Sequence, residues 1–134
     1  MKFKFLEHTA DIKFQAFGGS LEEVFENSAL AVKKIMFDGK VKEKIKKEIK
    51  IKGRDNERLM YEFLEELLIL LDSEDFILSD IKKIEIKNNV LKVEITGDKA
   101  SDYDFNNDVK AVTYNDMFIK KQNNEWVSQV VLDV

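Results

Sequence analysis

Two aspartates close to opposite ends of the sequence carry the chemistry that this chain could support. Asp11 lies between two short predicted strands, and Asp133 follows the last predicted strand. The sequence ends at Val134, so we expect a free α-carboxylate one residue beyond Asp133. If the first and last strands are neighbours, three carboxylates converge, and their mutual repulsion favours a bound cation. Oxygen ligands of this kind select Ca²⁺ or Mg²⁺, with water completing the coordination shell.

Each of these candidates also has a simpler interpretation. Acidic residues near a chain end are commonly solvated and frayed. His8 is the only histidine, and a lone histidine is more often a hydrogen-bonded loop residue than a catalyst. The alternative is that His8 acts as a base beside a metal held by Asp11 and Asp133, which would make the chain a metal-dependent phosphoester hydrolase.

Other kinds of site find little support in the sequence. The chain has no cysteine, which excludes disulfides, thiolate zinc sites and cysteine nucleophiles. No G-x-S-x-G sequence is present for a serine nucleophile, and the Gly18-Gly19-Ser20 turn lacks the lysine of a phosphate-binding loop. Segment 102–108 alternates oxygen-bearing side chains, but Asn107 and Thr113 stand where an EF-hand loop needs glycine and glutamate. We therefore predict a mobile polar loop there.

The apolar spacing predicts two helices. Ser20 and Glu23 form a capping box that opens the first, and apolar residues at helical spacing continue it to Met36. The second follows residues 54–56 and carries a similar apolar stripe. Ile69 and Leu70 widen that stripe, so we expect the second helix to be covered on more than one side.

Strands are predicted on both sides of these helices. Single strands are expected at residues 3–7, 12–17 and 45–52. Two hairpins turn at Asn88-Asn89 and at Asn123-Asn124, because asparagine tolerates a positive φ, and the second joins strands expected at 117–121 and 126–132. Hairpins leave no crossover helices, which argues against a doubly wound parallel fold. The expected fold is one α+β domain over residues 1–134, a two-layer sandwich with a largely antiparallel or mixed sheet and two helices packed on one face.

Charge and hydropathy restrict the partners. The net charge is −4, and the lysines of residues 40–52 are interleaved with acidic and strand-forming residues. We therefore interpret this stretch as a solvated strand face and expect RNA to be met only indirectly, through a partner. No apolar run is long enough for a signal peptide or a membrane span, so we expect a cytoplasmic protein without membrane contact.

Several segments, in order along the whole chain, resemble the archease family. They are His8-Thr9-Ala10-Asp11-Ile12, residues 20–27, 63–68 and 109–114, and the ending Val131-Leu132-Asp133-Val134. The resemblance implies an accessory protein of RtcB-type tRNA-splicing ligases, which use GTP and manganese. Such a protein promotes guanylylation of the ligase and its multiple turnover, and is not itself an enzyme. A general chaperone or adaptor without ligase specificity is the other non-enzymatic alternative.

The resemblance also implies roles for particular positions. Asp11, Asp133 and Val134 match the calcium-binding positions of the family, with Val134 able to offer only main-chain or terminal oxygen. We expect His8, Lys110 and Thr113 to help as partner contacts or supports of the site. Two departures bear on this: Asn115 stands where the family usually has histidine, and the stretch 97–108 is shorter and lacks an Arg-His pair. The resemblance therefore does not extend to roles that need further histidines.

Overall fold

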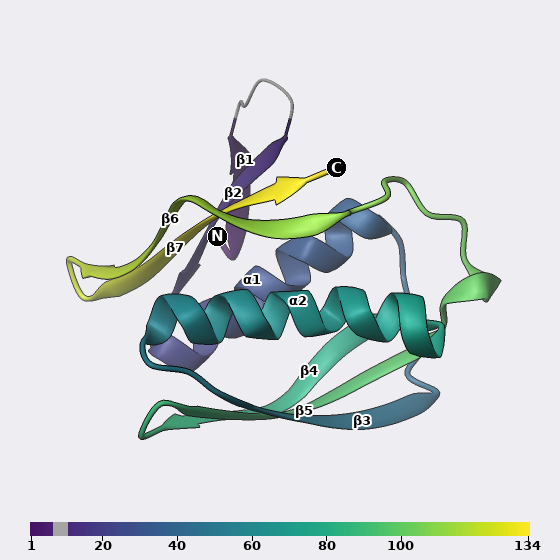
Figure 1. Ribbon diagram of the computed structural model, residues 1–134, viewed down its shortest axis with the longest axis horizontal. Coiled ribbons are helices and arrows are strands. Elements are labelled where there is room, and N and C mark those ends of the chain that lie inside the picture. Colours follow the sequence, from purple (N-terminus) through teal and green to yellow (C-terminus); the bar gives the residue numbers. More distant parts are fainter. Residues whose placement is uncertain (7–10) are drawn as a thin grey trace.

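The computed structural model describes residues 1–6 and 11–134, which form two long helices and two antiparallel sheets (Figure 1). The elements in chain order are β1 (Phe3–Leu6), β2 (Ile12–Gly18), α1 (Leu21–Met36), β3 (Ile45–Lys52), α2 (Asn56–Glu74), β4 (Phe76–Lys87), β5 (Val90–Lys99), a short 3₁₀ turn (Ala100–Asp102), β6 (Ala111–Gln122) and β7 (Glu125–Asp133).

The strands are divided between two sheets. Sheet A has the order β1-β2-β7-β6, and sheet B has the order β3-β5-β4. Helix α1 contacts β2 and β7 of sheet A and β4 of sheet B, while α2 contacts β6 on one side and β3 and β4 on the other. Both helices therefore lie between the sheets, as Figure 1 shows. The predicted α+β class and antiparallel pairing are confirmed, and the helices pack on one face of each sheet. The second sheet makes three layers where we expected two.

Helix α1 is covered on both sides because its apolar and small residues occupy a wide arc. Its buried positions include Val24, Val32 and Ile35 of the predicted stripe and also Asn27 and Ala31 beside it. Together with Phe25, Ser28, Ala29 and Met36, they span roughly 200° of the helix surface at 3.6 residues per turn, about twice the stripe of a helix with one buried face. The extra width is what allows a sheet on each side.

The predicted capping box at the start of α1 is present with one change. The Ser20 side chain accepts a hydrogen bond from the Glu23 backbone N–H at 3.1 Å. The Glu23 carboxylate reaches back to the Gly19 N–H at 2.9 Å, one residue before the cap itself. The first bond satisfies a donor that the first turn of a helix leaves without an intrahelical partner, and the second ties the residue before the cap to the helix.

Both predicted hairpins are confirmed. Asn88 and Asn89 have φ of 52° and 59°, and Asn123 and Asn124 have φ of 50° and 66°. These are the left-handed values that a two-residue type I′ turn requires. Strand β6 begins at Ala111, six residues before the strand that we predicted at 117–121, because a bulge between Thr113 and Phe118 interrupts its alternation. No helix in the described part of the chain is both long and apolar enough to cross a membrane.

Candidate functional site

The structure brings the two candidate aspartates to neighbouring strand ends. Strand β2, which follows Asp11, pairs with β7, and the last pair of this ladder is Ile12 with Leu132. One further step in the same antiparallel register places Asp11 opposite Asp133. The first strand, β1, pairs only with β2, so the first and last strands are not neighbours as the sequence-based expectation required; the second strand, β2, is the neighbour of β7 instead. Asp11 is half-buried and Asp133 is exposed.

A third strand reaches the same edge of sheet A. Ala111 of β6 pairs with Asp133, and the Lys110 N–H donates to the Asp133 carbonyl oxygen at 2.8 Å. This bond holds Lys110, whose side chain is exposed, beside the aspartate pair. Val134 is half-buried against the hydrophobic core. The sheet therefore gathers four of the six candidate residues, Asp11, Lys110, Asp133 and Val134, at one edge.

A hollow of about 430 Å³ opens beside Asp11. It is lined by Phe5, Leu6, Ile12 and Ile35 and by the polar residues Asp11, Lys34, Asp38 and Asn107. Lys34 and Asp38 form an exposed ion pair at 3.8 Å. No local sequence pattern points to Asp38, Lys34 or Asn107, because none shows that the end of α1 packs next to the start of β2.

The polar segment 102–108 turns out to anchor the end of α1. The Asn107 side-chain amide donates to the Ile35 carbonyl oxygen at 2.9 Å, and the Asn106 N–H donates to the Met36 carbonyl oxygen at 2.8 Å. The Asn106 side-chain oxygen accepts from the Asp38 N–H at 2.6 Å. The first two bonds satisfy carbonyl groups that the last turn of a helix leaves without partners. Asn106 thus positions the backbone of Asp38, and Asn107 borders the hollow.

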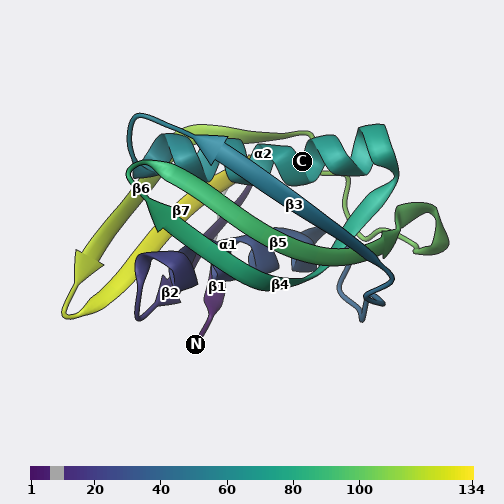
Figure 2. The same cartoon turned by 90° about the horizontal axis from the view of Figure 1, so that it is seen from below.

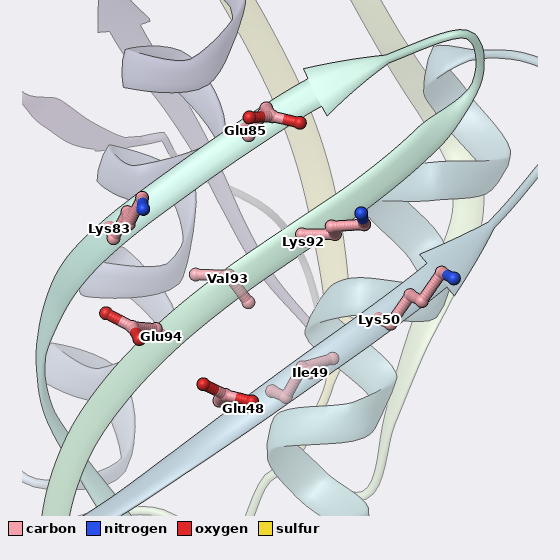
Figure 3. Close-up of a pocket in the computed structure, with 8 residues that line it drawn as sticks. All are labelled: Glu48, Ile49, Lys50, Lys83, Glu85, Lys92, Val93 and Glu94. Carbon is pink, nitrogen blue, oxygen red and sulfur yellow. The ribbon is translucent and has the colours of Figure 1, made fainter.

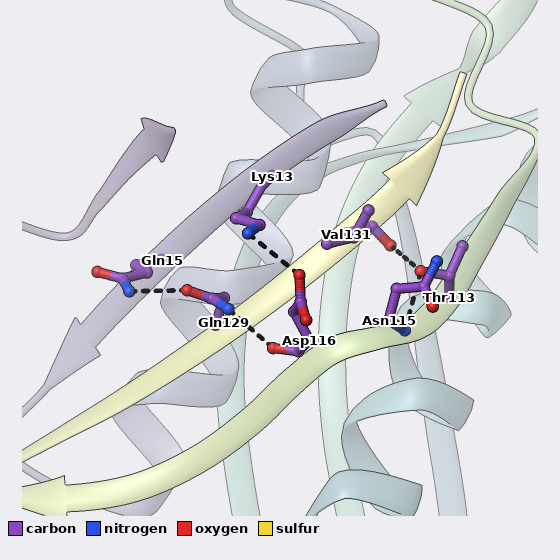
Figure 4. Close-up of polar contacts among 7 residues, drawn as sticks. All are labelled: Lys13, Gln15, Thr113, Asn115, Asp116, Gln129 and Val131. Carbon is purple, nitrogen blue, oxygen red and sulfur yellow. Dashed lines mark hydrogen bonds and ion pairs between the residues drawn. The ribbon is translucent and has the colours of Figure 1, made fainter. Parts of the chain in front are cut away.

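Thr113 has its hydroxyl engaged inside the fold. Figure 4 shows it donating to the Val131 carbonyl oxygen, at 3.0 Å, and accepting from the Asn115 N–H, at 3.3 Å. The bonds lie at the start of the bulge in β6. The geometry therefore favours Thr113 as a support for the bulge over a direct contact to a partner. Asn115, the residue at the histidine position of the family, is exposed.

The bulge is tied to the rest of sheet A by a polar chain across its outer face (Figure 4). Asp116 has φ of 54°, and its carbonyl oxygen accepts from the Gln129 side chain at 2.8 Å. Its carboxylate pairs with Lys13 at 3.3 Å. Gln129 in turn accepts from the Gln15 side chain at 2.9 Å. Strands β2, β7 and β6 are thereby linked near the ends that carry Asp11, Asp133 and Lys110.

Tyr114, the last residue of segment 109–114, connects this sheet to α2. Its ring stacks on Tyr61 with centroids 4.4 Å apart and planes 7° apart. Its hydroxyl accepts from the Arg58 guanidinium at 3.1 Å. This bond is the main reason why the pKa of Arg58 is raised, with the neighbouring Glu62 carboxylate adding to the effect.

The donor set at the strand ends fits a hard cation in its chemistry. Asp11 and Asp133 supply carboxylate oxygens, which Ca²⁺ and Mg²⁺ prefer. Residues 1–6 and 11–134 contain no cluster of three or more Asp, Glu, His or Cys side chains placed to hold a metal ion. Two aspartates would therefore have to be supplemented by main-chain oxygen, such as that of Val134, and by water. His8 lies outside the described residues, so its predicted role stays a prediction.

Known proteins from one family resemble this chain over its whole length. A model of the archease protein family matches residues 3–134. The archease of Sulfurisphaera tokodaii is 40% identical, covering 99% of this chain and 99% of the relative. The archease of Methanosarcina acetivorans is 36% identical, covering 99% of this chain and 96% of the relative.

Two solved structures resemble this one. The solution structure of a Methanobacterium thermoautotrophicum protein superposes with a TM-score of 0.84 at 34% identity, covering 99% of both chains. The crystal structure of a Thermotoga maritima protein, described as an archease and possible chaperone, superposes with a TM-score of 0.68 at 21% identity, covering 98% and 96%. The second likeness speaks for the fold alone.

Proposed function

Since the chain belongs to the archease family, we propose that it is an accessory protein of an RtcB-type tRNA-splicing ligase, and not the catalyst. In this proposal it promotes guanylylation of the ligase and its multiple turnover. The Asp11/Asp133 edge of sheet A holds Ca²⁺ or Mg²⁺ and meets the ligase near its active site. RNA is contacted through the ligase.

One observation carries the proposal. Two acidic residues separated by almost the whole chain occupy opposite positions at the end of the β2–β7 ladder. Residues directly opposite each other on neighbouring strands project to the same face of a sheet. The two carboxylates can therefore bind one Ca²⁺ or Mg²⁺ together.

In this proposal each residue at this edge of sheet A has its own role. Asp11 and Asp133 would hold the cation, which supplies positive charge at the surface that meets the ligase. Lys110, held beside them by its bond to Asp133, would contact the partner. Thr113 keeps the bulge in place. The ligase would be activated only if this edge binds its guanylylation-competent state more tightly than its other states.

The test is multiple-turnover RNA ligation by the partner ligase with GTP and Mn²⁺, with and without this chain. We expect strong activation by the intact chain and its loss in Asp11→Ala and Asp133→Ala. Asp72→Ala is the matched control, since Asp72 is an exposed aspartate on α2. Circular dichroism of each variant separates lost function from lost folding.

The outcomes distinguish the alternatives. If the intact chain does not activate the ligase, the proposal is wrong. Hydrolysis of a phosphoester by this chain alone, lost on chelation and in Asp11→Ala, would instead identify a metal-dependent hydrolase. Binding to unrelated unfolded proteins without metal would identify a general chaperone.

A further inference from the structure

Strand β3 forms an open edge of sheet B. It pairs with β5 on one side, and no described strand pairs with its other side. The Gly53 N–H donates a hydrogen bond to the Asn89 carbonyl oxygen, and these two residues form the next pair after the β3–β5 ladder. Because bonded pairs alternate in an antiparallel ladder, the backbone groups of Lys47, Ile49 and Ile51 point to β5. Those of Lys46, Glu48, Lys50 and Lys52 point away from it, and no hydrogen bond within the described chain satisfies them.

A groove runs along this edge. It has a volume of about 360 Å³ and is lined by residues 47–51 of β3 and by Glu66, Leu70 and Glu74 of α2. In Figure 2, α2 lies behind β3 and its C-terminal half extends past the outer edge of the strand. A strand added to β3 would lie about 4.8 Å from it. Its inner side chains would then face α2.

The wall that α2 provides is apolar and acidic. Leu70 is buried at 4% exposure, whereas Ile69 next to it is 46% exposed. Glu66 precedes Ile69 by three residues and is therefore its neighbour on the helix surface. The pKa of Glu66 is raised, first by burial and then by the charges of Glu74 and Glu62. Glu74 has a cation, Lys47 at 2.6 Å, but no cation of the described chain pairs with Glu66.

The opposite face of the same edge is mostly basic. Figure 3 shows the Glu48 and Lys50 side chains on the outer face of sheet B, and alternation puts Lys46 and Lys52 on that face as well. A strand beside β3 would present its residues alternately to the two faces. The inner residues would meet Leu70 and Glu66, and the outer ones would meet the three lysines.

We propose that the groove between β3 and α2 binds an extended segment of a partner protein, which adds to sheet B as a strand alongside β3. The segment alternates between two kinds of residue. Inner positions are apolar, with one lysine or arginine facing Glu66. Outer positions are acidic and lie beside Lys46, Lys50 and Lys52. Backbone bonds to the open edge supply affinity, and the alternation supplies specificity. This site is separate from the Asp11/Asp133 edge and does not depend on the ligase.

A second copy of this chain fits the groove less well. Two copies joined symmetrically through β3 would place both α2 helices on the same side of the joined sheets. Because α2 extends past the edge of β3 (Figure 2), each helix would occupy space that the other needs. A two-fold pairing centred on Ile49 would also set Lys46 against Lys52 of the second copy, and like charges directly opposite each other destabilise a sheet.

The test uses a capped synthetic peptide as long as β3. In this peptide glutamate alternates with valine, and one central valine is replaced by lysine. Its binding to the whole chain is followed by NMR, through the shifts and hydrogen exchange of each backbone amide. We expect the amides of Glu48 and Lys50 to exchange about tenfold more slowly when the peptide is at roughly ten times its Kd. Two matched peptides carry backbone N-methyl groups, one on the glutamates and one on the valines. One of them should lose binding, the first if the strand adds antiparallel and the second if it adds parallel.

Variants of the protein test the same geometry. Lys50→Pro removes an amide that points away from β5, a position where an edge strand tolerates proline, and should abolish peptide binding. Lys50→Ala is the control that keeps the amide, and it should weaken binding only mildly. If Lys50→Pro does not fold, the binding of the two N-methylated peptides to the unaltered protein tests the same backbone hydrogen bonds.

Three results would overturn the proposal. The first is no binding of the parent peptide at millimolar concentration, and the second is equal binding of all three peptides. The third is protection of the Glu48 and Lys50 amides by self-association without peptide, which would make this edge an interface between two copies.

Discussion

Helix α2 lies between β6, an outer strand of sheet A, and β3, an outer strand of sheet B. Its polar contacts with the two strands differ. Toward β6, the carboxylates of Glu57 and Glu65 each accept from a backbone N–H of the strand at 3.3 Å. Tyr61 and Arg58 add a stacked ring and a hydrogen bond at Tyr114. Toward β3, the described residues provide one polar link, the ion pair between Glu74 and Lys47.

The difference shows how one helix can close one sheet and leave another open. Open strand edges invite pairing with other chains, and proteins commonly cover or charge them. The β6 edge of sheet A, the sheet whose strand ends carry Asp11 and Asp133, is closed by side chains from α2. Sheet B keeps four outward-facing residues on β3 and relies on lysines to limit self-association. The same contrast recurs within α2 itself, where Glu65 and Glu66, and Leu70 and Ile69, are consecutive residues with different surroundings.

The largest expected effect contrasts Leu70 with Ile69. Leu70→Ala should lower the free energy of unfolding by about 2–5 kcal/mol, because it leaves a cavity under the groove. Ile69→Ala should change it by no more than about 0.5 kcal/mol, because this side chain is already exposed. Urea unfolding of both variants measures the two values. Similar losses in both would mean that Ile69 is covered in solution.

The next effect contrasts Glu65 with Glu66. Glu65→Ala leaves the N–H of buried Val112 without its acceptor and should cost about 1–3 kcal/mol of stability. Glu66→Ala makes the same change on the next residue of the helix, where no such bond is lost, and should cause no loss. Hydrogen exchange of the Val112 amide should accelerate only in the first variant. Unchanged exchange there would show that α2 does not close the β6 edge through Glu65.

A smaller effect concerns the tyrosine pair on the closed side. In a double-mutant cycle with Tyr61→Ala and Tyr114→Ala, we expect a coupling energy of about 0.5–1.5 kcal/mol, as for stacked aromatic pairs. Tyr114→Phe keeps the ring but removes the bond to Arg58, and serves as the control for the hydroxyl. Coupling indistinguishable from zero would mean that the stacking adds nothing to the closure of sheet A.

Local sequence patterns predicted most of the elements. Capping at Ser20, the asparagine turns and the strand at 45–52 depend on neighbouring residues, and the structure confirms them. The division into two sheets depends instead on how wide the buried surface of each helix is. Ile69 shows the limit: an apolar residue on a helix predicts burial, but the packing of the two sheets around α2 leaves this side chain exposed.

The candidate site could be predicted only in part for a similar reason. Asp11 and Asp133 were selected because they lie at predicted strand ends, and the register of β2 and β7 then places them opposite each other. Asp38 and Asn107 were missed because they reach the hollow through the packing of α1 and through bonds formed across about half the chain. Residue type alone also could not show that the Thr113 hydroxyl is engaged within sheet A.

The smallest effect is a pH dependence on the open side. The pKa of Glu66 is raised above its ordinary value, because burial and the charges of Glu74 and Glu62 disfavour its ionised form. The folded chain therefore binds the Glu66 proton more tightly than the unfolded chain, and stability should fall as pH rises from the ordinary pKa of 4.5 through the raised value. Glu66→Gln removes this ionisation, so the variant should be more stable than the parent at neutral pH and lose that advantage below the ordinary pKa. Parallel urea titrations across this range measure the difference. In the presence of a peptide that places a lysine against Glu66, the sign should reverse: the cation favours the ionised carboxylate, and the parent chain should then gain more from the peptide at neutral pH than Glu66→Gln does.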